Sequence, residues 1–460
     1  MTTTQGIDGQ DSTQRRKDAK AQGFVFASLR LCALALTLMV QGCGAWRAAE
    51  SRKIVLPPAS PLPPDIEASE GAIRFLEARV KRDPDDFTAH NKLAGYYLQR
   101  LRETGNLDYL NLARRTADAS LKAIPAEQNA GGLALLAQTE FAAHNFVGAR
   151  DHAGQLVKLE PRKSYPYQLL GDALLELGAY DEAKRAFREM ERRDASSVGT
   201  WVRLGRLAML EGRTEASRKH FQDALVLAAD AAPPSRETLA WCRWQLGELE
   251  FSLGAYEAAE GYYRESLVTF PDYYRALAGL GRVRAARGAT EEAITHYERA
   301  VRIIPEPSFL AALGDLYQIN GRKSDAEAQF ALVEQIARLN AAGGSVYNRQ
   351  LALFYADHDV KPEEGYQLAK REYEARRDVY GADALAWTAF KAGHIAEARS
   401  AIKDAMRLGT EDARLLYHAG MISRAGADRI AARDYLERAL KVSPQFDPRQ
   451  APIAAKALSE

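Results

Sequence analysis

The chain has 460 residues, of which 47% are hydrophobic and 27% charged, a composition that can bury cores and excludes a disordered polymer. Its 62 basic and 61 acidic residues cancel, so no global field favours nucleic acid as a partner. Three cysteines are too few for a disulfide scaffold or a four-cysteine zinc module.

The first 42 residues have the features of a secretory signal. A basic stretch that ends at Arg30 precedes the uncharged run Leu31–Val40, and small residues follow before a break. This run of ten residues makes about 15 Å of helix, half of a bilayer core, so it is too short to span a membrane unaided. We interpret residues 1–42 as a signal peptide that is removed from the mature protein.

The residues around Cys43 resemble the lipobox of bacterial lipoproteins, in which a cysteine follows a small residue such as Gly42. The resemblance implies that Cys43 is lipidated and becomes the first mature residue. Gln41 departs from the commoner small residue. By the rule of that family, Gly44 favours the periplasmic face of the outer membrane in a cell with two membranes. The alternative is an uncleaved anchor or a buried helix.

Residues 43–66 are predicted to join this anchor to the rest of the chain. Five of the 18 prolines fall between Pro57 and Pro64, which favours a stiff polyproline II conformation. At about 3.1 Å per residue, such a spacer reaches up to roughly 70 Å. We therefore expect a lipidated cysteine followed by a proline-rich tether.

A small residue recurs along residues 67–444, most often every 33 or 34 positions. The series is Ala94, Ala137, Gly171, Gly205, Gly247, Gly281, Gly314, Ala352, Ala386 and Ala419. Two longer intervals predict breaks in the repeat near residues 102–108 and 230–236. Small side chains at such positions let two antiparallel helices approach closely.

Two further positions repeat with this series. A glycine follows seven residues later, where we expect it to end the first helix in a left-handed conformation: Gly178, Gly212, Gly254, Gly288, Gly321, Gly393 and Gly426. An aromatic residue lies in the second helix and is predicted to fill the space between helices: Phe187, Phe221, Tyr263, Tyr297, Phe330 and Tyr435.

These positions resemble the tetratricopeptide repeat, with its 34-residue period. Trp201, Leu204 and Gly205 match the opening of its pattern, and Ala183 with Phe187 matches the middle. The resemblance implies an all-α protein: a right-handed superhelical α-solenoid of about ten helix pairs. A lone helix near residues 72–84 would cap the array, and residues 445–460 would form a tail or a second cap.

The sequence carries no recognised catalytic motif. Its eight histidines lack the spacing of a zinc site, and Gly314–Ser324 lacks the spacing of a phosphate-binding loop. Ser400 and Lys403 have the spacing of a serine–lysine pair but lie within a repeat and have no partner motif. We therefore expect no enzyme activity, no cofactor and no metal.

In the tetratricopeptide family the first helix of each unit lines the concave face of the superhelix. Carried onto this chain, that resemblance predicts a groove for a protein or peptide segment lined by Tyr165, Gln168, Asp172, Arg206, Trp241, Trp244, Glu248, Arg275, Arg282 and Arg349. The same register adds Val202, Phe251, Asp315 and Trp387. The lysine–asparagine set with which some members bind a C-terminal carboxylate is missing from these positions.

The sequence thus favours a membrane-anchored, non-enzymatic scaffold in the cell envelope. By resemblance, such lipoproteins assist envelope assembly, secretion, pilus biogenesis or polysaccharide export. Two alternatives remain open: an envelope enzyme or enzyme subunit with an unrecognised site, and a cytosolic repeat adaptor whose N-terminus is an incorrectly assigned extension.

Overall fold

The computed structural model describes residues 54–62, 66–342 and 349–460. The signal peptide, Cys43 and most of the linker predicted around it lie outside these residues. Within them the chain forms 22 α-helices and no strand, so the prediction of an all-α solenoid is confirmed. No helix in this part of the chain is long and apolar enough to cross a membrane.

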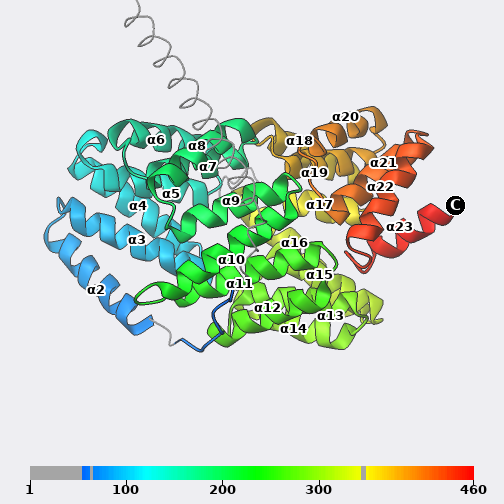
Figure 1. Cartoon of the computed structure of the whole chain (residues 1–460), viewed down its shortest axis with the longest axis horizontal. Helices are drawn as coiled ribbons and strands as arrows, with labels where there is room; N and C mark the ends of the chain where they lie inside the picture. Colours follow the sequence, from blue (N-terminus) through cyan, green and yellow to red (C-terminus); the bar gives the residue numbers. More distant parts are fainter. Residues whose placement is uncertain (1–53, 63–65, 343–348) are drawn as a thin grey trace, which may run out of the picture. The chain divides into compact units, whose positions relative to one another are not determined.

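The helices form ten consecutive antiparallel pairs with a single helix at each end (Figure 1). Helix α2 (Ile66–Arg82) precedes the pairs, and α23 (Gln450–Ser459) follows them. The pairs are α3 (Phe87–Thr104) with α4 (Asp108–Ala123), α5 (Ala130–Ala142) with α6 (Phe146–Leu159), α7 (Tyr165–Glu176) with α8 (Tyr180–Arg193), α9 (Val198–Leu210) with α10 (Thr214–Asp230), α11 (Arg236–Ser252) with α12 (Tyr256–Thr269), α13 (Tyr274–Ala286) with α14 (Thr290–Ile303), α15 (Pro307–Ile319) with α16 (Lys323–Ala342), α17 (Arg349–Asp357) with α18 (Pro362–Ala375), α19 (Val379–Lys391) with α20 (Ile395–Ala405), and α21 (Ala413–Ala425) with α22 (Arg429–Val442).

The repeated small residues lie where the two helices of a pair touch. A Cβ added to Gly171 would lie 2.3 Å from the ring of Phe187, and one added to Gly247 would lie 2.5 Å from the ring of Tyr263. Tyr263 also contacts Gly279 of the next pair, so the aromatic residue packs both within its pair and between pairs. The repeat spacing therefore reflects close helix packing around buried rings.

The turn glycines adopt the predicted left-handed conformation in six of the seven units. Gly426 is the exception, because its φ is −81° and the left-handed position is taken by Ala427, with φ of 59°. The seventh and eighth pairs are irregular in another way, since α16 of the seventh pair has 20 residues and α17 of the eighth has only 9.

Beyond α18 the array packs against its own earlier units. We call the contacts between residues 176–256 and residues 376–445 the seam. The hydroxyl of Tyr180 accepts a hydrogen bond from the Val379 N–H at 2.8 Å, and the hydroxyl of Thr410 donates to the Leu210 carbonyl at 2.6 Å. Figure 1 shows α18 and α19 next to α8 and α9. The superhelix therefore completes a turn, and the next turn lies on the first.

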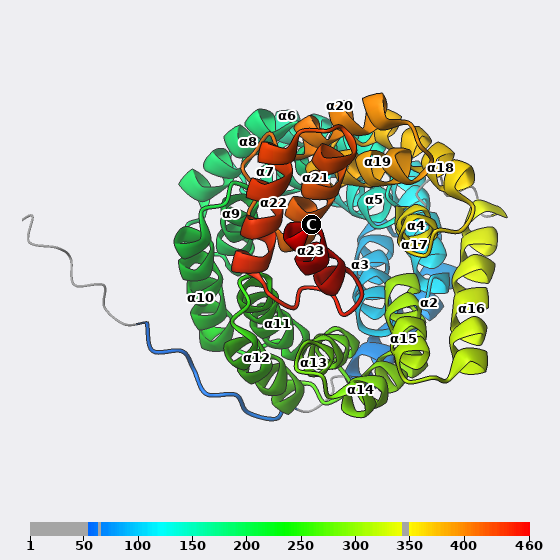
Figure 2. The ribbon, with the colours of Figure 1, turned by 90° about the vertical axis from the view of Figure 1, so that its right-hand side faces the viewer.

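The seam contacts join residues that are 187 to 200 positions apart. The hydroxyl of Tyr256 is 2.9 Å from that of Ser443, which continues the seam to the end of α22. Figure 2 shows the last three helices, in orange to red, across the middle of the ring that the other helices form. This stacking brings residues of the C-terminal units next to the first helices of the middle units.

Candidate functional site

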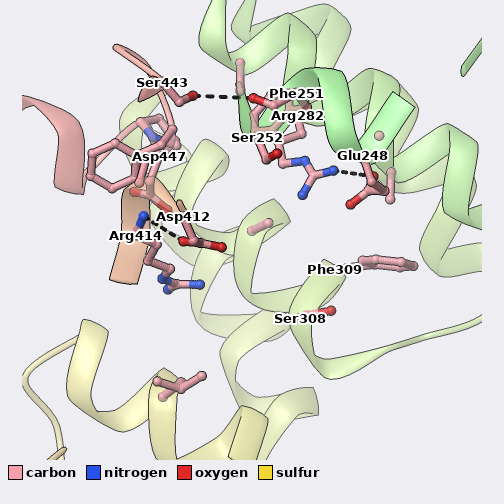
Figure 3. Close-up of a pocket in the computed structure, with 18 of the residues that line it drawn as sticks. Glu248, Phe251, Ser252, Arg282, Ser308, Phe309, Asp412, Arg414, Ser443 and Asp447 are labelled. Carbon is pink, nitrogen blue, oxygen red and sulfur yellow. Dashed lines mark hydrogen bonds and ion pairs between the residues drawn. The ribbon is translucent and has the colours of Figure 1, made fainter. Parts of the chain in front are cut away.

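A cavity of about 570 Å³ lies between the middle units and the C-terminal units of the array. Its walls come from the first helices α11, α13, α15, α17, α19 and α21 and from the loop that follows α22. Figure 3 shows Glu248 and Arg282 on one side, with Asp412, Arg414 and Asp447 on another. The cavity is large enough for several side chains of a bound segment.

Aromatic residues supply much of the cavity's apolar surface. Trp244 and Phe251 come from α11, Phe309 comes from α15, and Tyr380 and Phe446 come from the C-terminal units. Large aromatic rings are common anchors at protein interfaces because they bury much area for little conformational entropy.

Three of the cavity's arginines are neutralised by nearby carboxylates. Arg282 pairs with Glu248, Arg414 pairs with Asp357, and Arg349 is 2.6 Å from Asp378. Each of these pairs fixes the direction of its guanidinium. These three arginines are therefore already bound within the protein.

Arg275 differs from the other three cavity arginines. Its guanidinium carbon lies 5.2 Å from the centre of the Trp244 ring and 5.1 Å from that of Tyr274. Among the described residues, no carboxylate lies within ion-pair distance of it. Cation–π contacts stabilise the charge only in part.

Two aspartates at the cavity keep one carboxylate oxygen free. Oδ1 of Asp412 accepts hydrogen bonds from the N–H groups of Arg414 and Leu415, at 2.9 and 3.0 Å. Oδ1 of Asp447 accepts two such bonds at the start of α23, both at 2.9 Å. In the part of the chain that the structure describes, nothing donates to the Oδ2 atom of either residue.

Burial raises the pKa of the Asp412 carboxyl, and the nearby charge of Asp383 raises it further. Asp383 is itself buried and bonds to His418 Nδ1 at 2.9 Å. Ionisation of Asp412 is therefore unfavourable in the protein alone, and a cation in the cavity would offset that cost. Glu306 also lies at the cavity, and its charge acts on Arg275. Asp412 and Asp447 are the carboxylates that remain for a basic group of a bound segment.

The structure brings five of the ten predicted groove residues to this cavity: Trp244, Glu248, Arg275, Arg282 and Arg349. Phe251 and Asp315, which the same register predicted, also line it. These residues belong to the first helices of the fifth to eighth pairs.

The other five predicted residues lie outside the cavity. The hydroxyl of Tyr165 donates to Glu160, Asp172 accepts a two-pronged bond from Arg203, and Arg206 is 2.5 Å from Glu176. Trp241 packs against Trp244 with 6.4 Å between ring centres, and Gln168 is half-buried on α7. Asp172 and Arg206 are bound by neighbouring units.

Trp387 was predicted to line the groove, and this prediction is wrong. Its side chain is 2% exposed, stacks on His418 with 4.1 Å between ring centres, and donates to Asp357 at 2.8 Å. The neighbouring α21 covers the position that an open array would leave accessible. His418 accordingly belongs to the packed core.

Reasoning from the sequence missed the cavity residues of the C-terminal units, chiefly Tyr380, Asp412, Arg414, Phe446 and Asp447. Their proximity to α11 and α13 depends on the pitch of the superhelix, which the repeat motif does not encode. Asp412 could have been identified only as a helix N-cap, and Asp447 only as an acidic residue shortly before the last helix.

The described residues provide no evident inorganic site. Among them, no group of three or more His, Cys, Asp or Glu side chains could bind a metal ion. Cys242 is buried on α11, and burial raises the pKa of its thiol to about 12. This cysteine is therefore unreactive at neutral pH.

The architecture is that of a helical-repeat protein with a cavity on its inner face. Residues 165–196, 197–268 and 244–306 match three family models, each described as a tetratricopeptide repeat. Residues 165–306 thus contain tetratricopeptide repeats, and the array is consistent with a protein-interaction scaffold.

Solved structures resemble parts of the array. The crystal structure of MamA is 22% identical and covers 38% of this chain and 97% of its own, with a TM-score of 0.30. A tetratricopeptide protein of Thermus thermophilus is 21% identical over 41% of this chain and 98% of its own, with a TM-score of 0.35. PilW, a type IV pilus biogenesis factor, is 19% identical over 45% and 93%, with a TM-score of 0.38. No curated protein matches the chain.

Proposed function

We propose that this protein is a lipid-anchored scaffold of the cell envelope that binds an extended segment of another protein in its central cavity. The cavity supports this proposal most directly, because it combines aromatic walls with charged groups that the protein itself leaves unpaired. Trp244 and Phe309 would receive apolar side chains of the segment. No covalent chemistry is needed for this function.

The charges at the cavity favour a segment with basic side chains. The free Oδ2 atoms of Asp412 and Asp447 lie next to the N-termini of α21 and α23, where the Oδ1 atoms of the same carboxylates already accept backbone N–H groups. A lysine or arginine brought to them would form charge-assisted hydrogen bonds in a partly desolvated site. Arg275 could at the same time bind an acidic group of the segment.

The cellular address is proposed from the sequence alone. The run Leu31–Val40, followed by Gly42 and Cys43, supports cleavage and lipidation at the cysteine. Gly44 supports the periplasmic face of the outer membrane where a cell has two membranes. Residues between Cys43 and the array would then connect the membrane to the scaffold.

Lipidation is tested by radiolabelled palmitate. We expect the label in the wild-type chain and none in Cys43→Ala. Absence of the label from the wild type would remove the anchor and favour a cytosolic adaptor.

The binding site is tested by co-purification of the lipidated protein from mild detergent with a matched pair of tryptophan variants. Trp244→Ala should lose the proteins that co-purify with the wild type, because Trp244 lines the cavity. Trp201→Ala is the control, since Trp201 stacks on His220 away from the cavity. Equal loss in both variants, or in neither, would contradict the assignment of the cavity.

A further inference from the structure

The proline-rich segment Leu56–Leu62, which we call the strap, packs on the array. The side chains of Leu56 and Leu62 contact the core cluster that contains Phe221 of α10 and Leu246 of α11. Val55, just before the strap, is 87% exposed. Figure 1 shows this stretch in blue beside α11. These residues are therefore more than a connection between an anchor and α2.

A buried arginine binds the backbone of the strap. Arg243 of α11 is 1% exposed, and its Nη2 donates to the Pro57 carbonyl at 3.3 Å. Its Nη1 donates to the Thr269 hydroxyl at 3.1 Å, and its Nε lies 3.4 Å from the Glu265 carboxylate. A buried guanidinium needs such partners, because an unpaired buried charge costs free energy. The strap supplies one of them.

The composition of the strap suits this role. Proline has no N–H group and favours the extended polyproline II form, so the segment leaves no backbone donor unsatisfied at Pro57 and Pro58. A segment that is already extended also loses little conformational entropy when it binds. A glycine- and serine-rich spacer would lose more.

We propose that the strap is a docking element whose receptor is the surface of α10–α12 around Arg243. The chain then leaves the array at α11, and the strap must detach before the full linker can extend. Trp244 and Glu248 of the cavity lie on the same helix as Arg243, so the strap and the cavity share α11.

Docking of the strap would also limit the distance between the membrane and the array. This consequence rests on the proposed function, because it requires a lipidated Cys43, whereas docking itself does not. If Cys43 is lipidated, only residues 44–55 lie between it and the docked strap. Twelve residues at about 3.1 Å each reach roughly 40 Å, against roughly 70 Å for the whole linker. Docking would therefore keep the α10–α12 side of the array close to the membrane.

Electron paramagnetic resonance tests docking on the complete chain in detergent. A nitroxide on Ser60→Cys, an exposed position of the strap, should give a slow-motion spectrum. Adding Leu56→Ser and Leu62→Ser should release the strap and produce a mobile spectrum, while Val55→Ser should leave the spectrum unchanged. A mobile spectrum without these leucine changes, or no response to them, would overturn the proposal.

A second measurement uses the strap as a free peptide. The complete chain with residues 54–62 deleted should bind a fluorescein-labelled peptide of residues 53–63 saturably. Replacing both leucines of the peptide by serine should weaken binding at least tenfold, because two partly buried apolar side chains are lost. Arg243→Lys in the array should also weaken it, because lysine lacks the planar fork of arginine. Absence of binding, or equal binding of both peptides, would contradict docking.

Neither measurement needs a partner or a membrane, so each can fail independently of the proposed function.

Discussion

Arg376, at the end of α18, donates to the carboxylate of Glu176, which lies 200 residues earlier at the end of α7. Glu176 also accepts from Arg206 of the next pair, and it is only 6% exposed. One buried carboxylate thus joins two neighbouring units and the following turn of the superhelix. The seam depends on polar contacts of this kind as well as on packing.

Glu176→Gln should destabilise the array substantially, because the change leaves Arg206 and Arg376 without their shared anion. Breaking a buried ion pair on one side typically costs about 3–5 kcal/mol. Urea unfolding followed by circular dichroism measures the loss. Glu437→Gln is the matched control, since Glu437 is 59% exposed and faces Arg433 at the surface. A similar small effect of both changes would show that the seam does not depend on Glu176.

The stability contributed by Glu176 should depend on pH. The guanidinium groups of Arg206 and Arg376 lower the pKa of the Glu176 carboxyl from 4.5 to about 2, despite its burial. A carboxyl with a lowered pKa stabilises the fold fully above its unfolded pKa, and this contribution disappears as the pH falls from about 4.5 to about 2. A shift of this size corresponds to about 3 kcal/mol.

The measurement for this prediction is the difference in unfolding free energy between the wild type and Glu176→Gln at several pH values. This difference should shrink across that acidic range. A difference that stays constant would contradict the lowered pKa.

Alanine substitutions at two turn glycines distinguish the cost of a clash at the seam from the cost of backbone strain. Gly178 and Gly288 have φ values of 76° and 75°, so alanine strains both backbones alike. A Cβ on Gly178 would lie 2.1 Å from the Arg377 carbonyl oxygen, whereas one on Gly288 meets nothing within 4 Å. Gly178→Ala should therefore cost about 1–3 kcal/mol more than Gly288→Ala in chemical unfolding. Equal costs would mean that the next turn does not press on Gly178.

Asp412→Asn should weaken binding in the cavity without reducing the stability of the fold at pH 7. Asparagine still caps a helix, but it removes a carboxylate whose raised pKa shows that ionisation is unfavourable in the folded state. For a raised acidic pKa, stability is fully present at low pH and decreases as the pH rises through the folded pKa. The variant should therefore be as stable as the wild type, or more stable, at pH 7, and should lose this advantage in acid.

The same variant should weaken binding of a basic segment in the cavity. Thermal unfolding at pH 7 and pH 3 checks the stability, and co-purification checks the binding. A variant that is clearly less stable at pH 7 would contradict the raised pKa. Unchanged binding would remove Asp412 from the proposed site.

The packing and the turns within each helix pair could be predicted from the sequence. Gly171 and Phe187 could be paired from their spacing, because both lie within one helix pair, and the left-handed turns followed from glycine. The seam could not be predicted, since Gly178 and Gly288 occupy the same repeat position and only the first touches the next turn. For the same reason Trp387 was placed at the groove, although α21 covers it.

Site-specific photo-crosslinking in living cells tests the central claim most directly. A photoreactive amino acid at Ser308, in the wall of the cavity, should give a crosslinked partner, and the adduct should weaken in the Asp412→Asn, Asp447→Asn double variant. The same residue at Ile430, whose side chain is 86% exposed and lies outside the cavity, should give none. No adduct at position 308, or equal adducts at both positions, would contradict a cavity that binds a protein segment.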